Sequence, residues 1–433
     1  RDVQAGYVDD LAGLLSRDMG RDAGDLSFGR GHDERGRRRV GRMIRFDRSD
    51  MREGYGREKL LDLLERGLEV VDPYRCVGGV ISFDGRRLRV GGTGYAVARR
   101  GVRIIAVGKA AVPMAAAAVE RLGSAVTDGI VVTRSGSVGA AGGLPVIEAA
   151  HPVPDARGAR AADAVGRVAD ATEAGDVIVC LLSGGGSALL AAPPPGVTWQ
   201  ELARTTRLLL ASGASIQEIN AVRRHLSTLQ GGWLARRLRP AAVITLALSD
   251  VLDDAPEAIA SGPTVPDPTT VDDAVGVLQR YGLWPRVPAS IREQLVAGDD
   301  RETPKPGDPA FDRSVFRTIA NNATVLDALE RGAREAGWHV VRSLKPILGE
   351  ARDAGRRLGQ ETADRAGGAD HPTMLLAGGE TTVTVRGGGR GGRNQEFALA
   401  AAQAMAGTGR ACVVARATDG SDGVTDAAGA LVD

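Results

Sequence analysis

Short apolar runs bounded by Gly or Asp alternate with Ala-rich helical patterns along most of this chain. An apolar stripe at helical spacing from Leu60 to Val71 marks the start of the folded part. A longer helical pattern covers residues 199–238. Because the apolar runs lack polar alternation, they predict strands that are buried on both faces, as in a parallel sheet covered by crossover helices. In the first half of the chain these runs lie at 102–107, 129–133, 176–182 and 241–248.

A second set of alternating elements follows a Pro-rich segment at 285–309. Its strands are expected near 315–319, 338–342, 374–377, 381–385 and 412–417. The pattern predicts an α/β protein of two α/β domains. We expect a Rossmann-like N-terminal domain with a parallel sheet at 55–290, a linker at 291–312 and a smaller domain at 313–433. Residues 1–52 are rich in Arg, Asp and Gly without periodicity, and are expected to form a disordered extension.

Charge and cysteine content narrow the class of partner. The chain has 433 residues and a formal net charge of +1, so it offers no overall field to a nucleic acid or an anionic membrane. No apolar run approaches the roughly 18–20 residues that span a bilayer. The three cysteines are far apart and lack CxxC spacing, which indicates neither a disulfide framework nor a cysteine zinc site. We expect a cytoplasmic protein with no nucleic-acid or membrane partner, and a homodimer is one assembly that the sequence allows.

Lys109 is the first candidate for chemistry. In open α/β sheets, ligands bind beyond the carboxyl ends of the strands, and Lys109 follows the strand at 102–107. It is one of only four lysines in a chain whose other basic side chains are almost all Arg. An ammonium at a helix start opposes the helix dipole unless an anion lies between them, which favours a phosphate or carboxylate ligand. The alternative is a surface lysine whose stem packs on apolar neighbours.

A glycine-rich turn follows the strand at 176–182. Consecutive glycine amides can converge on phosphate oxygens at the start of a helix, and a serine hydroxyl can cap the helix or donate to the ligand. Glycines also serve tight turns, so in isolation the motif is weak. The sequence predicts a site for the phosphates of a nucleotide, formed by Ser183, Gly184, Gly185, Gly186 and Ser187.

Asp250 follows the strand at 241–248. A carboxylate at a strand end can hold a magnesium ion or accept the proton of a substrate hydroxyl. The same residue type also forms Asx turns and helix caps. Asp250 is therefore a candidate both for catalysis and for metal binding, and the sequence does not separate the two roles.

The segment 386–393 consists only of glycines and arginines, and it leads into an expected helix. This pattern describes another anion cradle, in which Arg393 would offer the fixed, bidentate cation that a transferring phosphoryl group requires. Glu380 follows the strand expected at 374–377, one strand earlier in the chain, and is a candidate for substrate binding.

A further cluster lies within the helical block. Arg223 and Ser227 follow Asn220 by three and seven residues, so the three side chains would share one face of a helix. That face could present an amide, a guanidinium and a hydroxyl to a small carboxylate, while a solvated helix is the simpler interpretation. His151 is a lone histidine in a turn, and we assign it no chemistry.

Glycine-rich cradles, a lysine and an arginine on different domains, and available carboxylates together indicate phosphoryl transfer. The order of the motifs closely resembles that of the glycerate 2-kinase family with a MOFRL C-terminal domain, whose members are sometimes labelled hydroxypyruvate reductase. The resemblance extends from about Arg57 to the end of the chain. It is carried by Val107-Gly-Lys-Ala-Ala111, His151-Pro-Val-Pro-Asp155, Leu182-Ser-Gly-Gly-Gly-Ser-Ala-Leu189, Ser212-Gly-Ala214, Ile219-Asn220, Val222-Arg223, Ser249-Asp-Val251, Ser261-Gly-Pro-Thr264, Gly378-Gly-Glu-Thr-Thr-Val383 and Gly391-Gly-Arg-Asn-Gln-Glu-Phe397.

The resemblance implies a reaction and roles for particular residues. The reaction is the ATP-dependent phosphorylation of D-glycerate at its 2-hydroxyl to 2-phosphoglycerate, with Mg²⁺, in the cleft between the two domains. Lys109 and Arg393 match the family's proposed catalytic lysine and arginine. As a hypothesis of our own, the substrate's carboxylate would be held either by the second domain or by Asn220 and Arg223.

Three departures from the family pattern bear on activity. Gln230 stands where the family usually has Lys, so a cation is missing there. Asp253 stands where Gly is favoured, so the loop after Asp250 is expected to differ in shape. Family members continue beyond Asp433 for a short stretch, so the MOFRL domain is expected to be truncated at its C-terminus.

Two rival functions remain open from the sequence. Gly387, Gly389 and Gly392 spell GxGxxG, which together with the family's older label suggests an NAD(P)H-dependent hydroxypyruvate reductase. No acidic residue stands near the position that would bind the ribose. The second rival is a catalytically impaired sugar-acid-binding homologue, suggested by Gln230 and the expected truncation.

Overall fold

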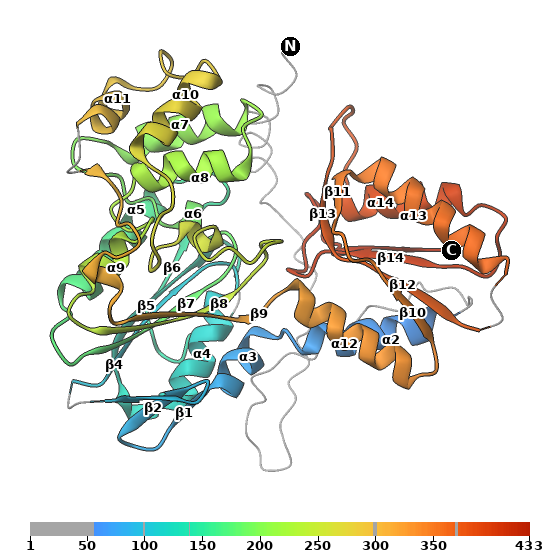
Figure 1. Cartoon of the computed structure of the whole chain (residues 1–433), viewed down its shortest axis with the longest axis horizontal. Coiled ribbons are helices and arrows are strands. Elements are labelled where there is room, and N and C mark those ends of the chain that lie inside the picture. The colour runs from blue at the N-terminus through green and yellow to red at the C-terminus, as the bar shows by residue number, and fades with distance from the viewer. Residues whose placement is uncertain (1–55, 98–99, 138, 298–300, 369–370) are drawn as a thin grey trace, which may run out of the picture.

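A computed structural model describes residues 56–97, 100–137, 139–297, 301–368 and 371–433. The extension expected at 1–52 lies outside these residues. The described chain forms two α/β lobes, left and right in Figure 1, joined where β9 (Ser314–Ala320) leads into α12 (Asn322–Glu335). The predicted α/β class is therefore confirmed.

The first lobe is built on a six-stranded parallel sheet. The chain enters at a central strand, moves out to one edge and returns beside its starting point, so that the strand order is β6-β5-β4-β7-β8-β9. This is the order of a doubly wound, Rossmann-like sheet, and its reversal point lies between β4 and β7. The strands are β4 (Val102–Val107), β5 (Val126–Arg134), β6 (Val146–Ala149), β7 (Val177–Leu182), β8 (Ala242–Leu248) and β9.

Helices cover both faces of this sheet, as the unbroken apolar runs predict. α4 (Ala111–Leu122) shares one core with Ile104 and Val179, whereas α5 (Ala156–Asp170) shares the other with Ile105 and Cys180. Side chains of successive strand residues point to opposite faces, which divides the apolar run between the two cores. Burial raises the pKa of the Cys180 thiol to about 12, so this cysteine is a core residue without thiolate chemistry.

A helical cap lies at the upper left of Figure 1, beyond α5 on one side of the six-stranded sheet. The helical pattern at 199–238 is divided into three helices, because Gly213, Gly231 and Gly232 adopt left-handed backbone angles, with φ of 81°, 59° and 86°. The segment expected as a linker packs here too, since Ile291 and Leu295 are buried in the core of the cap. The helices are α7 (Trp199–Leu210), α8 (Ile216–His225), α9 (Trp233–Arg237), α10 (Val271–Arg280) and α11 (Ala289–Val296).

Two side-chain contacts fix α8, which carries two of the candidate site residues. Arg224 pairs with Asp267 at 2.9 Å, with side chains only 5% and 0% exposed. His225 Nε2 lies 2.9 Å from Glu302 Oε1, and its Nδ1 lies 2.8 Å from the Ala221 carbonyl oxygen. α8 is thus held at its C-terminal end by charged partners from the 267–302 region.

The hydrogen bonds to Glu302 make the stability of the fold depend on pH. Burial alone would raise the pKa of Glu302, but hydrogen bonds from Lys305, the Val271 amide and His225 lower it to about 2. A carboxyl whose pKa is lowered by folding stabilises the protein above its unfolded pKa and loses that contribution as pH falls through the folded one. We expect Glu302→Gln to lower the free energy of unfolding by about 2 kcal/mol at pH 7. Denaturant unfolding should show this difference shrinking between pH 4.5 and pH 2; a constant difference would contradict it.

Within the described residues, the second lobe has three two-stranded sheets, and its helices α13 and α14 pack side by side. β10 pairs with β12 and β11 with β13 in parallel, whereas β14 and β15 are antiparallel. Gly355 and Gly359 of α13 allow close approach to α14, since a Cβ at either would lie 2.1 and 2.6 Å from backbone oxygens of that helix. The elements are β10 (His339–Arg342), β11 (Ile347–Glu350), α13 (Ala351–Ala366), β12 (Thr373–Leu376), β13 (Gly379–Thr382), α14 (Arg393–Ala404), β14 (Val413–Arg416) and β15 (Gly429–Val432).

Two segments cross between the lobes in ways that the sequence did not predict. The strand expected near 315–319 as the start of the second set is β9, the edge strand of the first sheet, paired with β8. The opening helix α2 (Arg57–Glu69) packs on α12 of the second lobe, where Leu63 and Leu68 share a core with Leu329. Local periodicity identifies a helix or strand but not the partner that buries it. The domain boundaries themselves stay a prediction.

Smaller elements complete the described chain. α3 (Pro73–Val80) is capped by Asp72, whose side chain accepts from the Arg75 amide. An antiparallel sheet of β1 (Ile81–Phe83), β2 (Arg87–Val90) and β3 (Thr93–Ala96) follows, and the sequence did not predict it. No helix within the described ranges is long and apolar enough to cross a membrane.

Candidate active site

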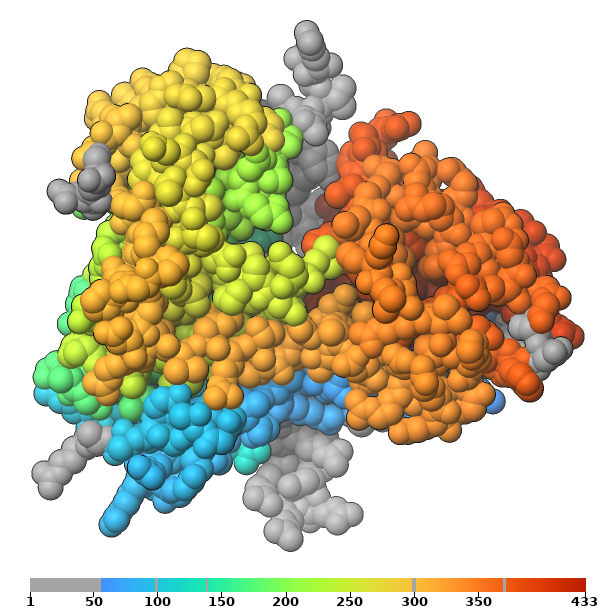
Figure 2. All heavy atoms as spheres, viewed as in Figure 1, coloured from blue at the N-terminus to red at the C-terminus, as the bar shows by residue number. Residues whose placement is uncertain are grey.

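A cleft of about 1340 Å³ lies at the carboxyl ends of the sheet strands and is lined by both lobes. Figure 2 shows the surface hollowed between the yellow-green first lobe and the orange-red second lobe. The cleft adjoins the reversal point between β4 and β7, where doubly wound sheets bind their ligands. Its polar lining includes Lys109, Gly184 and Asp250 from the first lobe and Glu380, Arg393 and Asp419 from the second.

Lys109 stands between β4 and α4, as the sequence predicts. Its backbone amide donates to the Gly184 carbonyl at 3.0 Å, and the next amide, of Ala110, donates to Ser183 Oγ at 3.0 Å. These bonds tie the start of α4 to the end of β7. Its Nζ pairs with Asp419 Oδ2 at 2.8 Å. The anion expected beside this lysine is thus supplied, in the structure, by a carboxylate of the opposite lobe.

The glycine turn leads from β7 into the short helix α6 (Gly186–Leu189). The amides of Gly184 and Gly185 donate to no acceptor among the described residues, which leaves them available to an anion. Gly185 has a φ of 84°. A Cβ at Gly184 would lie 1.8 Å from Asp250 Oδ2, and one at Gly186 would lie 2.5 Å from Ala260 Cβ. Side chains at these positions would therefore displace either the carboxylate or the neighbouring loop.

Asp250 lies directly against this turn. Its carboxylate faces the cleft, but the surrounding protein restricts its hydration, and this desolvation raises the pKa of Asp250 above its ordinary value. The charge of Lys109 opposes the rise, and the negative charges of Glu380 and Asp419 add to it. A carboxyl with a raised pKa is better matched to accept a proton from a hydroxyl than an ordinary surface aspartate.

Arg393 begins α14 on the opposite side of the cleft. Its Nη1 donates to Glu380 Oε1 at 2.7 Å, and the two side chains are 44% and 50% exposed. Glu380, predicted to bind substrate, therefore holds the arginine in the structure. Lys109 and Arg393 come from different lobes and line the same cleft.

The anion cradle predicted at the start of α14 already has an occupant. Asp422, which is 1% exposed, accepts from the Asn394 amide at 3.0 Å and from the Gln395 amide at 2.9 Å. Its carboxylate also accepts from both amide side chains. The helix N-terminus is thus capped by the protein itself, and what remains for a ligand is the guanidinium of Arg393.

Removing this cap should destabilise the second lobe. We expect Asp422→Ala to lower the free energy of unfolding by about 3 kcal/mol, because several buried donors lose their acceptor at once. The matched control is Asp426→Ala, at an exposed aspartate in the same loop, which should change it by less than about 0.5 kcal/mol. Thermal or denaturant unfolding measures both variants, and equal stabilities would show that the cap contributes nothing.

Asn220 and Arg223 are not on a solvated face. Both are buried, at 5% and 8% exposure. Ser227 does not share their helix, because α8 ends at His225, and its Oγ accepts instead from the Leu229 and Gln230 amides. The simpler interpretation of this helix as solvated is therefore wrong, and the predicted three-residue face is reduced to two.

The loop that contains Ser261 contacts both this helix and the residues that follow the glycine turn. Ser261 Oγ donates to Ser187 Oγ at 2.7 Å and to Asn220 Oδ1 at 3.4 Å. Ala260 and Ser261 both have left-handed backbone angles, with φ of 52° and 58°, which cost non-glycine residues energy and are typical of functional sites. Ser187, predicted to bind phosphate, thus lies beside Asn220.

Gln230 has a structural role where a cation was expected to be missing. It is 2% exposed, and its Nε2 donates to the Ser187 carbonyl at 2.8 Å and to the Leu190 carbonyl at 3.3 Å. The amide therefore fixes the residues that follow the glycine turn.

Sequence reasoning missed His151 and Asp419. Gly185 lies under both the His151 ring and the Lys109 stem, whose atoms would be 3.2 and 3.4 Å from a Cβ there. Restricted hydration and the charges of Lys109, Arg223 and Arg134 lower the pKa of His151 to about 4. Asp419 lies just beyond the end of β14. Strand ends are the positions that singled out Lys109 and Asp250, so the same criterion would have found Asp419.

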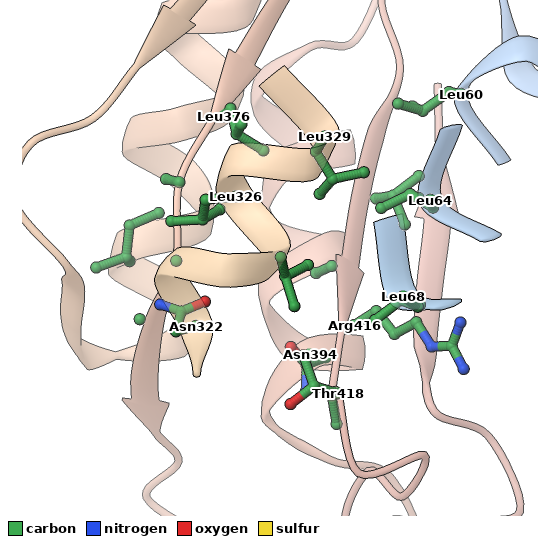
Figure 3. Close-up of a pocket in the computed structure, with 18 of the residues that line it drawn as sticks. Leu60, Leu64, Leu68, Asn322, Leu326, Leu329, Leu376, Asn394, Arg416 and Thr418 are labelled. Carbon is green, nitrogen blue, oxygen red and sulfur yellow. The ribbon is translucent and has the colours of Figure 1, made fainter. Parts of the chain in front are cut away.

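The cleft extends from these polar groups into an apolar region of the second lobe. Figure 3 shows leucines of α2 facing leucines of α12, with Asn322, Asn394 and Thr418 nearer the polar end. The apolar lining includes Leu60, Leu64, Leu68, Leu326, Leu329 and Leu376.

The GxGxxG match lies outside the context that dinucleotide binding requires. The loop at 387–392 connects β13 to α14, but the strand that follows, β14, pairs with β15 rather than with β13. A dinucleotide fingerprint belongs to a strand–helix–strand unit with parallel neighbours. Gly392 is instead packed against Asp422.

The chain is similar to known protein families and to individual proteins. Residues 59–296 match a domain of unknown function, DUF4147, and residues 373–433 match the MOFRL family. A glycerate 2-kinase of Pyrococcus horikoshii is 40% identical over 384 residues, 87% of this chain and 86% of that protein. A putative hydroxypyruvate reductase of Agrobacterium vitis is 42% identical over 334 residues, 76% of this chain and 75% of that protein.

The fold is shared with a solved relative. The crystal structure of glycerate kinase from Thermotoga maritima has a TM-score of 0.74 to this chain at 38% identity, and the match covers 87% of each chain. The resemblance inferred from ordered motifs is thereby confirmed. This chain belongs to the glycerate kinase family with DUF4147 and MOFRL domains.

Proposed function

We propose that the protein is a glycerate 2-kinase, which transfers the γ-phosphoryl group of ATP to the 2-hydroxyl of D-glycerate. The observation that carries this proposal is the convergence of Lys109 and Arg393, from opposite lobes, on one cleft beside a glycine turn with free amides. Phosphoryl transfer depends mainly on positioning and on cations that stabilise the spread negative charge. The names of the relatives, such as glycerate 2-kinase, support D-glycerate as the phosphoryl acceptor.

The two lobes would supply different contacts to the bound nucleotide. The amides of Gly184 and Gly185 would bind phosphate oxygens, with Lys109 beside them. Lys109 must then exchange Asp419 for phosphate, since the two groups are paired at 2.8 Å. Arg393, held by Glu380, would offer its guanidinium to the transferring phosphoryl group. Closure of the lobes would exclude water, as phosphoryl transfer to an alcohol requires.

Asp250 is the carboxylate nearest to the glycine turn, and it would accept the proton of the 2-hydroxyl or hold Mg²⁺. No group of three His, Cys, Asp or Glu side chains within the described ranges is arranged to hold a metal by itself. Mg²⁺ is commonly held by one or two carboxylates together with substrate phosphates, so a single carboxylate at this position fits it. When bound, the ion would neutralise part of the phosphate charge.

A coupled assay tests the proposal. Protein, ATP, Mg²⁺ and D-glycerate are incubated with enolase, and phosphoenolpyruvate formation is followed without a phosphoglycerate mutase. We expect signal from enolase alone, because only 2-phosphoglycerate is its substrate. A signal that requires the mutase would identify 3-phosphoglycerate and contradict the regiochemistry. NADH oxidation with hydroxypyruvate in a parallel assay would instead support the reductase alternative.

A further inference from the structure

Arg223 is a buried cation without a counterion among the described residues. Its side chain is 8% exposed, and burial lowers its pKa to about 10. Among the residues that the structure describes, none pairs a carboxylate with it, and its buried Nη2 has no hydrogen-bond partner. Buried polar groups are nearly always satisfied, and an uncompensated buried charge is costly. A group outside the described chain is therefore needed to complete the site.

The two basic residues that follow it on α8 behave differently. Arg224 has Asp267 and His225 has Glu302, and these pairs hold the helix to the protein. Arg223 takes no part in that anchoring. Its position is therefore not explained by the structural role of its neighbours.

Neutral groups surround the guanidinium. It lines a small cavity of about 10 Å³, which holds about one water-sized atom. The other polar residues of the lining are Ser187, Thr206, Ser227 and Gln230, and the rest of the lining is apolar. Asn220, one helical turn before Arg223, reaches Ser187 through Ser261. Hydroxyls and amides can bond an anion but cannot neutralise the guanidinium, so the missing group carries the negative charge.

This cavity adjoins the glycine turn of the proposed phosphate site, because Ser187 lines it. Ser187 ends the turn, and His151 lies on Gly185 beside the Lys109 stem. The charges of Lys109 and Arg223 both lower the pKa of His151, so both cations lie near enough to this imidazole to influence it. A ligand bound by Arg223 would therefore lie near the same glycine turn as Lys109.

We infer that Arg223 anchors the carboxylate of the acceptor substrate in the first lobe, with Ser187 and Asn220 beside it. One guanidinium matches the single charge of a carboxylate and can bond it bidentately. This rests on the proposed function, because the acid is there taken to be D-glycerate. It assigns acid recognition to the first lobe and leaves the second lobe's Arg393 to the phosphoryl group.

Arg223→Gln tests the assignment, with Arg207→Gln as the matched control on the neighbouring helix α7, where Arg207 is exposed. We expect the KM for D-glycerate to rise by about 100-fold in Arg223→Gln. The KM for ATP and kcat should change little, because the carboxylate contact is present in ground state and transition state alike. Arg207→Gln should match the parent. An unchanged KM for D-glycerate, or a rise confined to ATP, would overturn the assignment.

A binding measurement separates this inference from the proposed function. Titration calorimetry without nucleotide should show D-glycerate binding to the parent protein, with no detectable binding of its uncharged carboxamide. Arg223→Gln should bind neither. If D-glycerate binds in this Arg223-dependent way but no 2-phosphoglycerate forms with ATP, the inference stands and the kinase proposal fails. If the parent forms 2-phosphoglycerate and Arg223→Gln keeps its affinity for the acid, the reverse holds.

A second variant covers the case in which Arg223→Gln does not fold. Asn220→Asp keeps the acceptor for Ser261 and places a carboxylate one turn from the guanidinium. It should compete with the substrate's carboxylate, so we expect the KM for D-glycerate to rise at least 10-fold without loss of thermal stability. A folded Asn220→Asp variant with the parent's KM would count against the site.

Discussion

Lys109→Ala is expected to lower kcat by about 10³-fold with D-glycerate and ATP, because it removes the cation nearest to the glycine turn from the transferring phosphates. The fold should survive. The ion pair with Asp419 is partly exposed, with side chains at 25% and 36%, and such pairs contribute at most about 1 kcal/mol. Steady-state kinetics of 2-phosphoglycerate formation and a thermal unfolding curve measure the two quantities separately.

The control for this variant is Lys345→Ala, at an exposed lysine of the second lobe. It removes the same charge and should leave kcat unchanged. Near-parental turnover by Lys109→Ala would remove the lysine from the chemistry and leave it as an interlobe contact. A large drop in thermal stability, with kcat restored by cooling, would likewise point to a structural role.

Arg393→Lys is the second change with a large expected effect. Lysine keeps the charge but not the planar fork, so it cannot bond two phosphate oxygens at once. We expect kcat to fall by about 10²-fold in Arg393→Lys and by about 10³-fold in Arg393→Ala, with a smaller change in the KM for ATP. The graded loss is the informative result, because a purely electrostatic role would let the lysine variant work nearly normally.

Arg386→Ala is the matched control, since this exposed arginine lies in the same glycine-rich segment. It should turn over at the parental rate. Glu380→Gln complements the Arg393 and Arg386 variants. It keeps the length of the side chain at position 380 but weakens the 2.7 Å hydrogen bond from Arg393. If Arg393→Ala turned over as fast as Arg386→Ala, the second lobe would contribute no catalytic cation.

Much of the sheet could be predicted because its signal is local. The runs that become β4, β7 and β8 are apolar throughout, and the carboxyl ends of parallel strands gather at one edge, so Lys109, Gly184 and Asp250 could be expected together. The antiparallel β1–β3 sheet was missed because its strands are short and carry exposed arginines. The assignments of α2 and β9 to lobes failed because an apolar face does not specify its partner.

The parts of the site that were missed depend on long-range contacts. Asp422 fills the cradle at α14 from a loop 28 residues away, and Asp419 reaches Lys109 over 310 residues. A pattern of residue types cannot show that a protein carboxylate already occupies an anion site. Arg223 was misjudged in the opposite direction. The regular polar spacing of its helix suggested a solvated face, whereas the structure buries Asn220 and Arg223.

The central claim is that cations from the two lobes act on the same bound nucleotide. A crystal structure with a non-hydrolysable ATP analogue, Mg²⁺ and D-glycerate tests it most directly. We expect Lys109 Nζ and the Arg393 guanidinium each to lie within about 3 Å of oxygens of one triphosphate, with Lys109 released from Asp419. A nucleotide bound by one lobe alone, with the other lobe's cation in open solvent, would contradict the claim.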